Sequence, residues 1–156
     1  MPTVEPPNEA ERRHKQFAVN LFNRVWALME QSERTPEEAD EMLHAAHASV
    51  YHWSQVGGPQ NLAIGEWQVS RVYAVLGWPE SCRRHAERSL QICEQHGIGD
   101  FARAYAFEAL ARAAVLAGDG AERDHRLQQA RAAGEQIADA EDRKQLLDDL
   151  ADLGPR

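Results

Sequence analysis

The sequence predicts an all-α fold of about six to seven helices, arranged as antiparallel hairpins with a capping helix at the C-terminus. Apolar residues recur at helical spacing through almost the whole chain. No stretch alternates apolar and polar residues as a half-buried strand would. Proline and glycine residues interrupt the periodic segments at short intervals, which is typical of tight turns between helices.

The domain organisation follows from length and composition. A chain of 156 residues suits one domain, which we place at residues 9–153. Residues 1–8 contain three prolines, which block regular structure, so we expect this N-terminal segment to be disordered.

The first two helices are predicted from their caps and apolar faces. Asn8 can cap a helix that continues to about residue 31. Its expected buried face comprises Phe17, Ala18, Leu21, Phe22, Val25, Leu28 and Met29. Thr35 followed by Pro36 is a strong helix start, and this second helix should end near residue 55, before two glycines. Its expected apolar stripe comprises Ala39, Leu43, Ala46 and Val50.

The remaining helices alternate in character. Those predicted over 59–76 and 100–117 are apolar nearly all round, so we expect each to be contacted on two or more sides. Those over 79–96 and 121–137 are amphipathic and belong on the outside. A last helix over 141–153 carries Leu146, Leu147, Leu150 and Leu153 on one side, as expected of a cap over the final core face.

A repeat is visible when Gly77 is aligned with Gly118, a shift of 41 residues (118 − 77). Val69, Ser70 and Tyr73 then fall on Leu110, Ala111 and Ala114, and small residues recur at Cys82 and Ser89. Together they resemble the tetratricopeptide repeat, although its standard period is about 34 residues. The resemblance covers about residues 9 to 137 and extends to an uncharacterised group of bacterial repeat proteins.

The resemblance implies a concave groove lined by the first helix of each hairpin. Its side chains would be Ile64, Trp67, Arg71, Tyr105, Glu108 and Arg112. Aromatic residues and arginine together are typical of binding hot spots. We therefore expect a helical-repeat binding or scaffold module that takes a peptide, a protein or a small ligand in this groove. The alternative is a solvated face on which Trp67–Arg71 and Glu108–Arg112, each four residues apart, interact locally.

A second hypothesis is a metal-dependent enzyme or a metal-binding protein. His44 and His47 lie on one side of the second helix, and Glu66 lies on the apolar face of the third. These three residues could bind one ion. Alternatively, the histidines form a polar helix edge, and Glu66 makes a buried hydrogen bond to the second or fifth helix. No H-E-x-x-H motif or cysteine pair accompanies them, so the sequence favours a binding protein over an enzyme and identifies no cofactor.

Charge and composition restrict the partners. The formal net charge of −8 disfavours nucleic acid and anionic membranes, and no apolar run is long enough to cross a bilayer. Cys82 and Cys93 lie on one predicted helix, too far apart to bridge, which fits a reducing, cytoplasmic location. A protein or peptide partner is expected. The first helix offers Phe17, Phe22, Trp26 and Met29 over more than one side, which also suits a homodimer.

Overall fold

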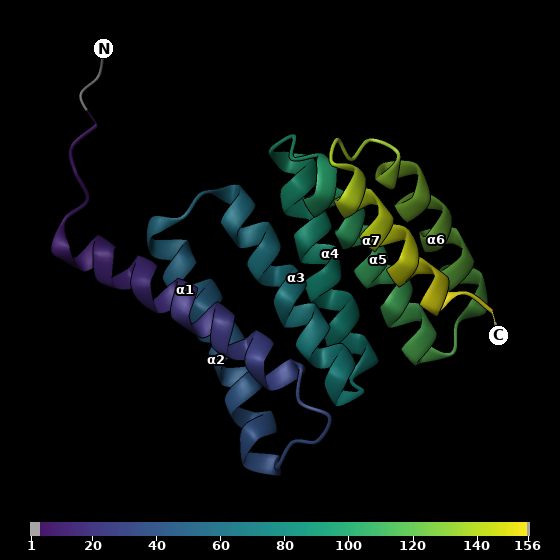
Figure 1. The fold of residues 1–156 in the computed structure, drawn as a ribbon, viewed down its shortest axis with the longest axis horizontal. Helices are drawn as coiled ribbons and strands as arrows, with labels where there is room; N and C mark the ends of the chain where they lie inside the picture. Colours follow the sequence, from purple (N-terminus) through teal and green to yellow (C-terminus); the bar gives the residue numbers. More distant parts are fainter. Residues whose placement is uncertain (1–3, 156) are drawn as a thin grey trace.

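The computed structural model describes residues 4–155 and, within them, contains seven α-helices and no strand (Figure 1). The helices are α1 (Glu9–Met29), α2 (Pro36–Val56), α3 (Pro59–Leu76), α4 (Pro79–Gln95), α5 (Asp100–Ala117), α6 (Gly120–Gly134) and α7 (Ala140–Leu153). The all-α prediction is confirmed, and each predicted helix end lies within one turn of the observed one.

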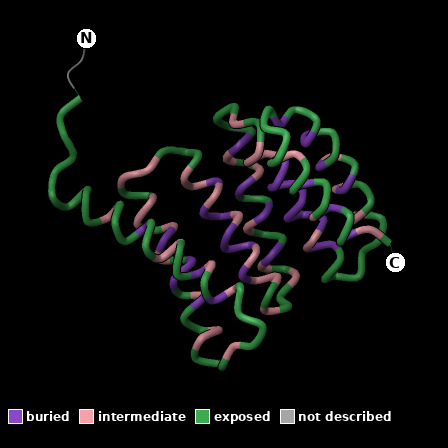
Figure 2. The backbone as a smooth tube through the Cα atoms, in the orientation of Figure 1, coloured by how far each residue is buried: buried purple, intermediate pink, exposed green. Residues whose placement is uncertain are grey.

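The helices pack as consecutive pairs, α1 with α2, α3 with α4, and α5 with α6. Helices α1, α3, α5 and α7 also contact one another in series, so they form one layer of the molecule, and α2, α4 and α6 form the other. Both α3 and α5 contact four other helices, which explains why their sequences are apolar nearly all round. Buried residues concentrate in this central part of the fold (Figure 2).

Local sequence signals fix the helix ends. Asn8 and Thr35 each accept a hydrogen bond from the backbone N–H three residues later. In both capping boxes the glutamate at that later position accepts a hydrogen bond from the backbone N–H of the capping residue. Gly77 and Gly118 end α3 and α5 with φ values of 76° and 71°, in the left-handed region that glycine adopts without a Cβ penalty. The two glycines used to align the repeat therefore occupy equivalent structural positions.

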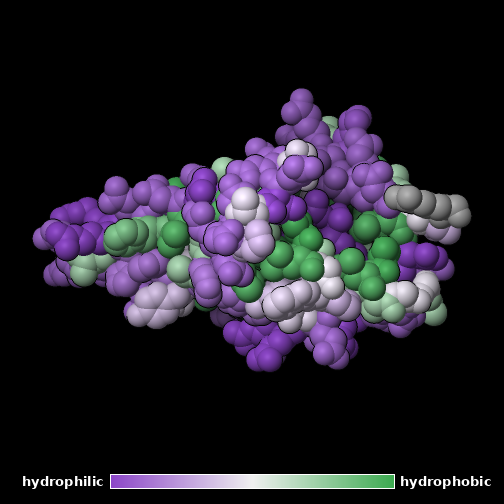
Figure 3. All heavy atoms as spheres, turned by 90° about the horizontal axis from the view of Figure 1, so that it is seen from below, coloured by the Kyte–Doolittle hydropathy of each residue, from purple (hydrophilic) through white to green (hydrophobic). Residues whose placement is uncertain are grey.

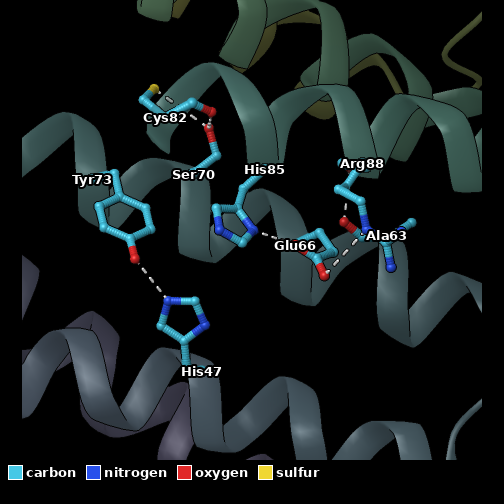
Figure 4. Close-up of polar contacts among 9 residues, drawn as sticks. His47, Ala63, Glu66, Ser70, Tyr73, Cys82, His85 and Arg88 are labelled. Carbon is cyan, nitrogen blue, oxygen red and sulfur yellow. Dashed lines mark hydrogen bonds and ion pairs between the residues drawn. The ribbon is translucent and has the colours of Figure 1, made fainter. Parts of the chain in front are cut away.

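Buried serines hold the hairpins together at close range. Ser70 Oγ donates to the carbonyl oxygen of Cys82 at 2.8 Å, and Ser89 Oγ donates to that of Ala63 at the same distance. These two bonds join α3 and α4 at two separate points along the hairpin, and Figure 4 shows the bond from Ser70 to Cys82. Ser49 Oγ likewise donates at 2.8 Å to the carbonyl oxygen of Ala18 between α2 and α1.

Two sequence-based expectations about helix faces hold only in part. The buried residues of α2 are Met42, Ala45, Ala46 and Ser49, whereas Ala39, Leu43 and Val50 lie half-buried at the border. The face is selected by α1, against which Ser49 is hydrogen-bonded. Phe17 was expected in the core but is 54 % exposed and stacks on His52 of α2 at 5.2 Å between ring centroids. The N-terminal part of α1 extends away from helices α3 to α7 (Figure 1).

Three further features concern the N-terminal segment, the hydropathy of the helices and the cysteines. Residues 4–8 form neither helix nor strand and are exposed, while residues 1–3 lie outside the described residues, so disorder over 1–8 stays a prediction. Between residues 4 and 155, no helix has both the length and the apolar character needed to span a bilayer. Cys82 and Cys93 are free and buried.

Candidate functional site

A pocket of about 390 Å³ opens between α1, α3, α5 and α7. Its wall is formed by Phe22, Trp26, Ala63, Ile64, Trp67, Arg71, Phe101, Ala102, Tyr105, Glu108, Gln145 and Asp149. The groove residues expected from the sequence thus come together, since all of them line the pocket except Arg112, which bonds to Glu108. We call this pocket the aromatic groove.

Aromatic side chains form a continuous row across three helices of the groove. The ring centroids of Phe22 and Trp26 are 6.4 Å apart, and those of Trp26 and Trp67 are 5.7 Å apart. Trp67 meets Tyr105 edge-on at 5.7 Å, and Tyr105 lies 4.4 Å from Phe101. Such offset and edge-on pairs are the favoured arrangements of aromatic rings. The row therefore links the first helices of all three hairpins.

The contacts of Trp67 differ from the local pairing considered for this face. Its ring packs on Trp26 and Tyr105. Among the described residues the cation–π contact is that of Arg103 over Phe107, and Trp67 does not stack on Arg71. The indole N–H of Trp67 is buried and finds no acceptor in the part of the chain described. Trp67 is thus held in place by ring contacts.

Gln68 links α3 to α1 beside the groove. Its side-chain amide donates to the carbonyl oxygen of Phe22 at 3.0 Å, and Gln68 is itself 1 % exposed. This bond joins α3 to α1 at the residue where the aromatic row begins. This hydrogen bond adds to the packing of α1 on α2, which places the first rings of the row beside α3.

Charged groups lie at one end of the aromatic row. Glu108 is 1 % exposed, and its Oε1 accepts bonds from Arg112 Nε at 3.0 Å and from Arg112 Nη2. Arg71 Nη1 lies 3.9 Å from the same oxygen, beyond hydrogen-bonding distance. Burial lowers the pKa of Arg71 from its ordinary value, and the charge of Arg112 acts in the same direction. Arg71 still carries its charge at neutral pH, because the pKa of a guanidinium is far above 7.

Helix α7 contributes a wall of the groove as well as a cap. Tyr105 Oη donates to Asp149 Oδ2 at 2.6 Å, and Gln145 also lines the pocket. Burial raises the pKa of Tyr105, and the bond to the Asp149 carboxylate raises it further, so the phenol stays protonated at neutral pH. From the sequence we expected α7 only to cap the core and did not predict that Gln145 and Asp149 line the pocket. Their signal was a polar pair, Gln145 and Asp149, spaced one turn apart beside the leucine stripe.

Beyond Arg71 lies a smaller apolar hollow of about 220 Å³. It is lined by Arg71, Ala74, Val75, Arg112, Val115, Leu116 and Leu153. Val75, Val115 and Leu116 are 38 %, 43 % and 39 % exposed at the C-terminal ends of α3 and α5. Seen from below, apolar residues gather in patches on a largely hydrophilic surface (Figure 3). Arg71 therefore stands between an aromatic hollow and an aliphatic one.

Glu66 does not line the groove and belongs to a separate cluster with His85 and Arg88 of α4 (Figure 4). As expected it is buried, at 9 % exposure, and has a polar partner. The partner comes from α4, not from α2 or α5: His85 Nδ1 lies 2.6 Å from Glu66 Oε2, and Arg88 Nε lies 3.9 Å from Oε1. Helix α4 takes this role because it packs on α3 over the whole length of the hairpin, which brings its polar edge beside Glu66.

The two histidines proposed as metal ligands do not form a site with Glu66. His44 is exposed, and His47 Nε2 is 2.9 Å from Tyr73 Oη. His47 also meets the ring of His85 at 5.3 Å between centroids, and both its partial burial and His85 hold the pKa of His47 below its usual value. Within residues 4–155, no three His, Cys, Asp or Glu side chains are grouped so that they could hold a metal ion. The structure thus gives no support to a centre on His44, His47 and Glu66.

A scan against models of known protein families and a search of curated proteins give no match to this chain. The candidate site is therefore defined by its own geometry: a row of aromatic rings, one half-buried arginine and a pair of carboxylates that other side chains already engage.

Proposed function

We propose that this protein is a helical-repeat binding module of tetratricopeptide-like architecture, which takes a peptide, a protein segment or a small ligand in the aromatic groove. The observation that carries the proposal is the row of aromatic rings from Phe22 to Tyr105 along a pocket of about 390 Å³. Pockets of this size, mostly apolar with a few converging polar groups, are the usual form of ligand sites in proteins.

The groove is suited to binding because its walls are already ordered. Trp26, Trp67 and Tyr105 are set on separate helices and fixed by ring contacts and by the bond from Gln68 to α1. A ligand that covers these rings gains apolar burial without having to order a loop, so little conformational entropy opposes binding. Arg71 at one end adds a charge that would orient the ligand.

The placement of α1 favours an external ligand over a homodimer. Phe22 and Trp26, considered above as a self-association surface, face the groove and contact α3. Phe17 alone among the large apolar residues of that set is exposed by more than half. We propose a protein or peptide as the partner. We also propose a cytoplasmic location, because free thiols such as those of Cys82 and Cys93 persist in a reducing compartment.

The test blocks the groove by added volume. Ala102 is half-buried in the pocket wall, and Ala102→Leu fills part of the cavity with a strong helix former. Ala132→Leu makes the same change at an exposed position of α6 and serves as the matched control. A random peptide library and a library of small aromatic compounds are selected against the full chain, and the affinity of each selected ligand is measured by calorimetry.

We expect selected ligands to lose at least about tenfold in affinity for Ala102→Leu, which corresponds to about 1.4 kcal/mol, and to bind Ala132→Leu as they bind the parent chain. Ligands whose affinity is the same for both variants would bind elsewhere and would contradict the proposal. A failure of both libraries to yield any binder at millimolar concentration would contradict it as well.

A further inference from the structure

We infer that the ligand of the aromatic groove is a small carboxylic acid with an aromatic ring, whose carboxylate is bound by Arg71. This inference rests on the proposed function and adds the chemical class of the ligand. It follows from three features: the unsatisfied guanidinium of Arg71, the carboxylates that are already engaged, and the distance between Arg71 and the aromatic row.

Arg71 is the cation in the groove that lacks an acceptor. Its side chain is 32 % exposed, and its nearest carboxylate contact is the 3.9 Å approach to Glu108 Oε1. Arg112 engages that oxygen through two nitrogens. Among the described residues, Arg71 makes only this long contact with an acidic group, while its burial reduces hydration. A half-buried guanidinium with open donors is a strong site for a planar, bidentate acceptor such as a carboxylate.

The acidic groups of the groove do not favour a cationic ligand. Glu108 is 1 % exposed and paired with Arg112, so a ligand cation would have to displace an existing charged hydrogen bond. Asp149 Oδ2 accepts a hydrogen bond from Tyr105 Oη, and the phenol stays protonated because its pKa is raised. Both carboxylates therefore have donors from the chain itself, whereas the guanidinium of Arg71 does not have an equivalent acceptor.

The arrangement also limits the size of the ligand. Trp67 and Arg71 are four residues apart on α3, so they lie on one face of the helix, about 5–6 Å apart at their Cβ atoms. A ring against Trp67 and a carboxylate against Arg71 can therefore belong to one molecule with a linker of a few atoms. The pocket volume of about 390 Å³ matches a compact ligand. A peptide with an acidic residue beside an aromatic one carries the same two groups and is the alternative that the experiment separates.

The experiment compares acids with their own amides. Phenylpropionate, indolepropionate and naphthylacetate are titrated into the full chain by calorimetry, in parallel with the corresponding primary amides, which keep the shape and lose the charge. Arg71→Gln removes the guanidinium while Glu108 keeps Arg112 as its partner. Arg71→Lys keeps the charge without the bidentate fork. Arg83→Gln, an exposed arginine on α4 outside the groove, is the matched control.

We expect at least one acid to bind with a dissociation constant of about 1 mM or tighter, and its amide at least about tenfold more weakly, because a hydrogen bond to a charged group is worth more than one to a neutral group. Arg71→Gln should lower the affinity for the acid to that for its amide, and Arg71→Lys should give an intermediate affinity. Arg83→Gln should leave the affinity for the acid unchanged. Thermal unfolding of each variant verifies that it folds, and Arg71→Lys carries the test if Arg71→Gln does not.

Each other outcome has a definite meaning. Acids and amides that bind equally, or an acid whose affinity Arg71→Gln leaves unchanged, would overturn the carboxylate assignment while the groove remains a binding site. Peptides that bind in a manner blocked by Ala102→Leu, with no acid binding, would overturn the small-molecule class and leave the proposed function intact. Absence of binding by acids, amides and peptides alike would overturn both.

Discussion

Replacing Gly65 by alanine tests how closely α2 approaches α3, and thereby the geometry of the groove. Gly65 lies in the middle of α3 and is buried against Val50 of α2. A Cβ added at Gly65 would lie 2.9 Å from Val50 Cγ2, closer than side chains pack in proteins. Val50 is β-branched and has little rotamer freedom in a helix, so the strain falls on the distance between the helices.

Two effects of opposite sign decide the magnitude. Glycine to alanine inside a helix is favourable by about 1 kcal/mol, because alanine restricts the unfolded chain and is the best helix former. Overpacking a close contact costs about 1–3 kcal/mol, so we expect a net loss of about 1 kcal/mol in the free energy of unfolding. The same alanine at Gly120, the first residue of α6, meets no atom closer than 3.7 Å and should cost nothing.

Urea unfolding monitored by circular dichroism measures these changes. Val50→Ala in the Gly65→Ala background should recover part of the loss, with a coupling energy of at least about 0.5 kcal/mol between the two sites. If Gly65→Ala were as stable as the parent chain or more stable, α2 and α3 would not approach as closely as described.

Three further predictions concern the packing around the groove and the Glu66 cluster. Ser89→Ala removes the bond to the carbonyl oxygen of Ala63 and should lower the unfolding free energy by about 1 kcal/mol in urea titrations, and an unchanged midpoint would contradict that bond. Arg112→Met removes both donors of the buried Glu108 and should cost about 3 kcal/mol, against less than about 0.5 kcal/mol for Arg83→Met, and equal costs would contradict the buried pair. Burial and His85 lower the pKa of His47 in the folded state, so the unfolded state binds more protons and stability falls as the pH drops below about 6.5. His47→Gln should reduce this loss of unfolding free energy between about pH 7.5 and 5.5, and an identical pH dependence of stability in the variant would refute the role of His47.

Most of the fold could be predicted from the sequence because its helix ends carry local chemical signals. Thr35 with Glu38 forms the expected capping box, and Gly77 and Gly118 adopt the left-handed conformation that ends a helix. The buried face of α2 is displaced by about one position along the helix from the apolar stripe predicted from the sequence. Several of its positions are small and weakly apolar, so the choice depends on the contact with α1, which is a tertiary effect.

Part of the site could also be predicted, because several of its residues lie on one helix. Ile64, Trp67 and Arg71 share one face of a single helix, so their convergence follows from periodicity. The contributions of Trp26 and Asp149 could not be found in this way, because they come from helices far apart in the chain and depend on how the hairpins stack. Glu66 was correctly expected to be buried, but its partner depends on the rotation of α4, which periodicity does not specify.

The tryptophan side chains allow the most direct test of the claim that the aromatic groove binds the ligand. Trp26 and Trp67 line the groove, whereas Trp53 lies near the end of α2 and Trp78 precedes α4, so two indole N–H signals report on the site and two serve as internal controls. A two-dimensional nitrogen–proton spectrum of the full chain is recorded while naphthylacetate is added. We expect saturating shifts of the Trp26 and Trp67 signals, with those of Trp53 and Trp78 unchanged. Shifts confined to Trp53 and Trp78, or no shift of any indole signal up to about ten times a millimolar dissociation constant, would contradict it.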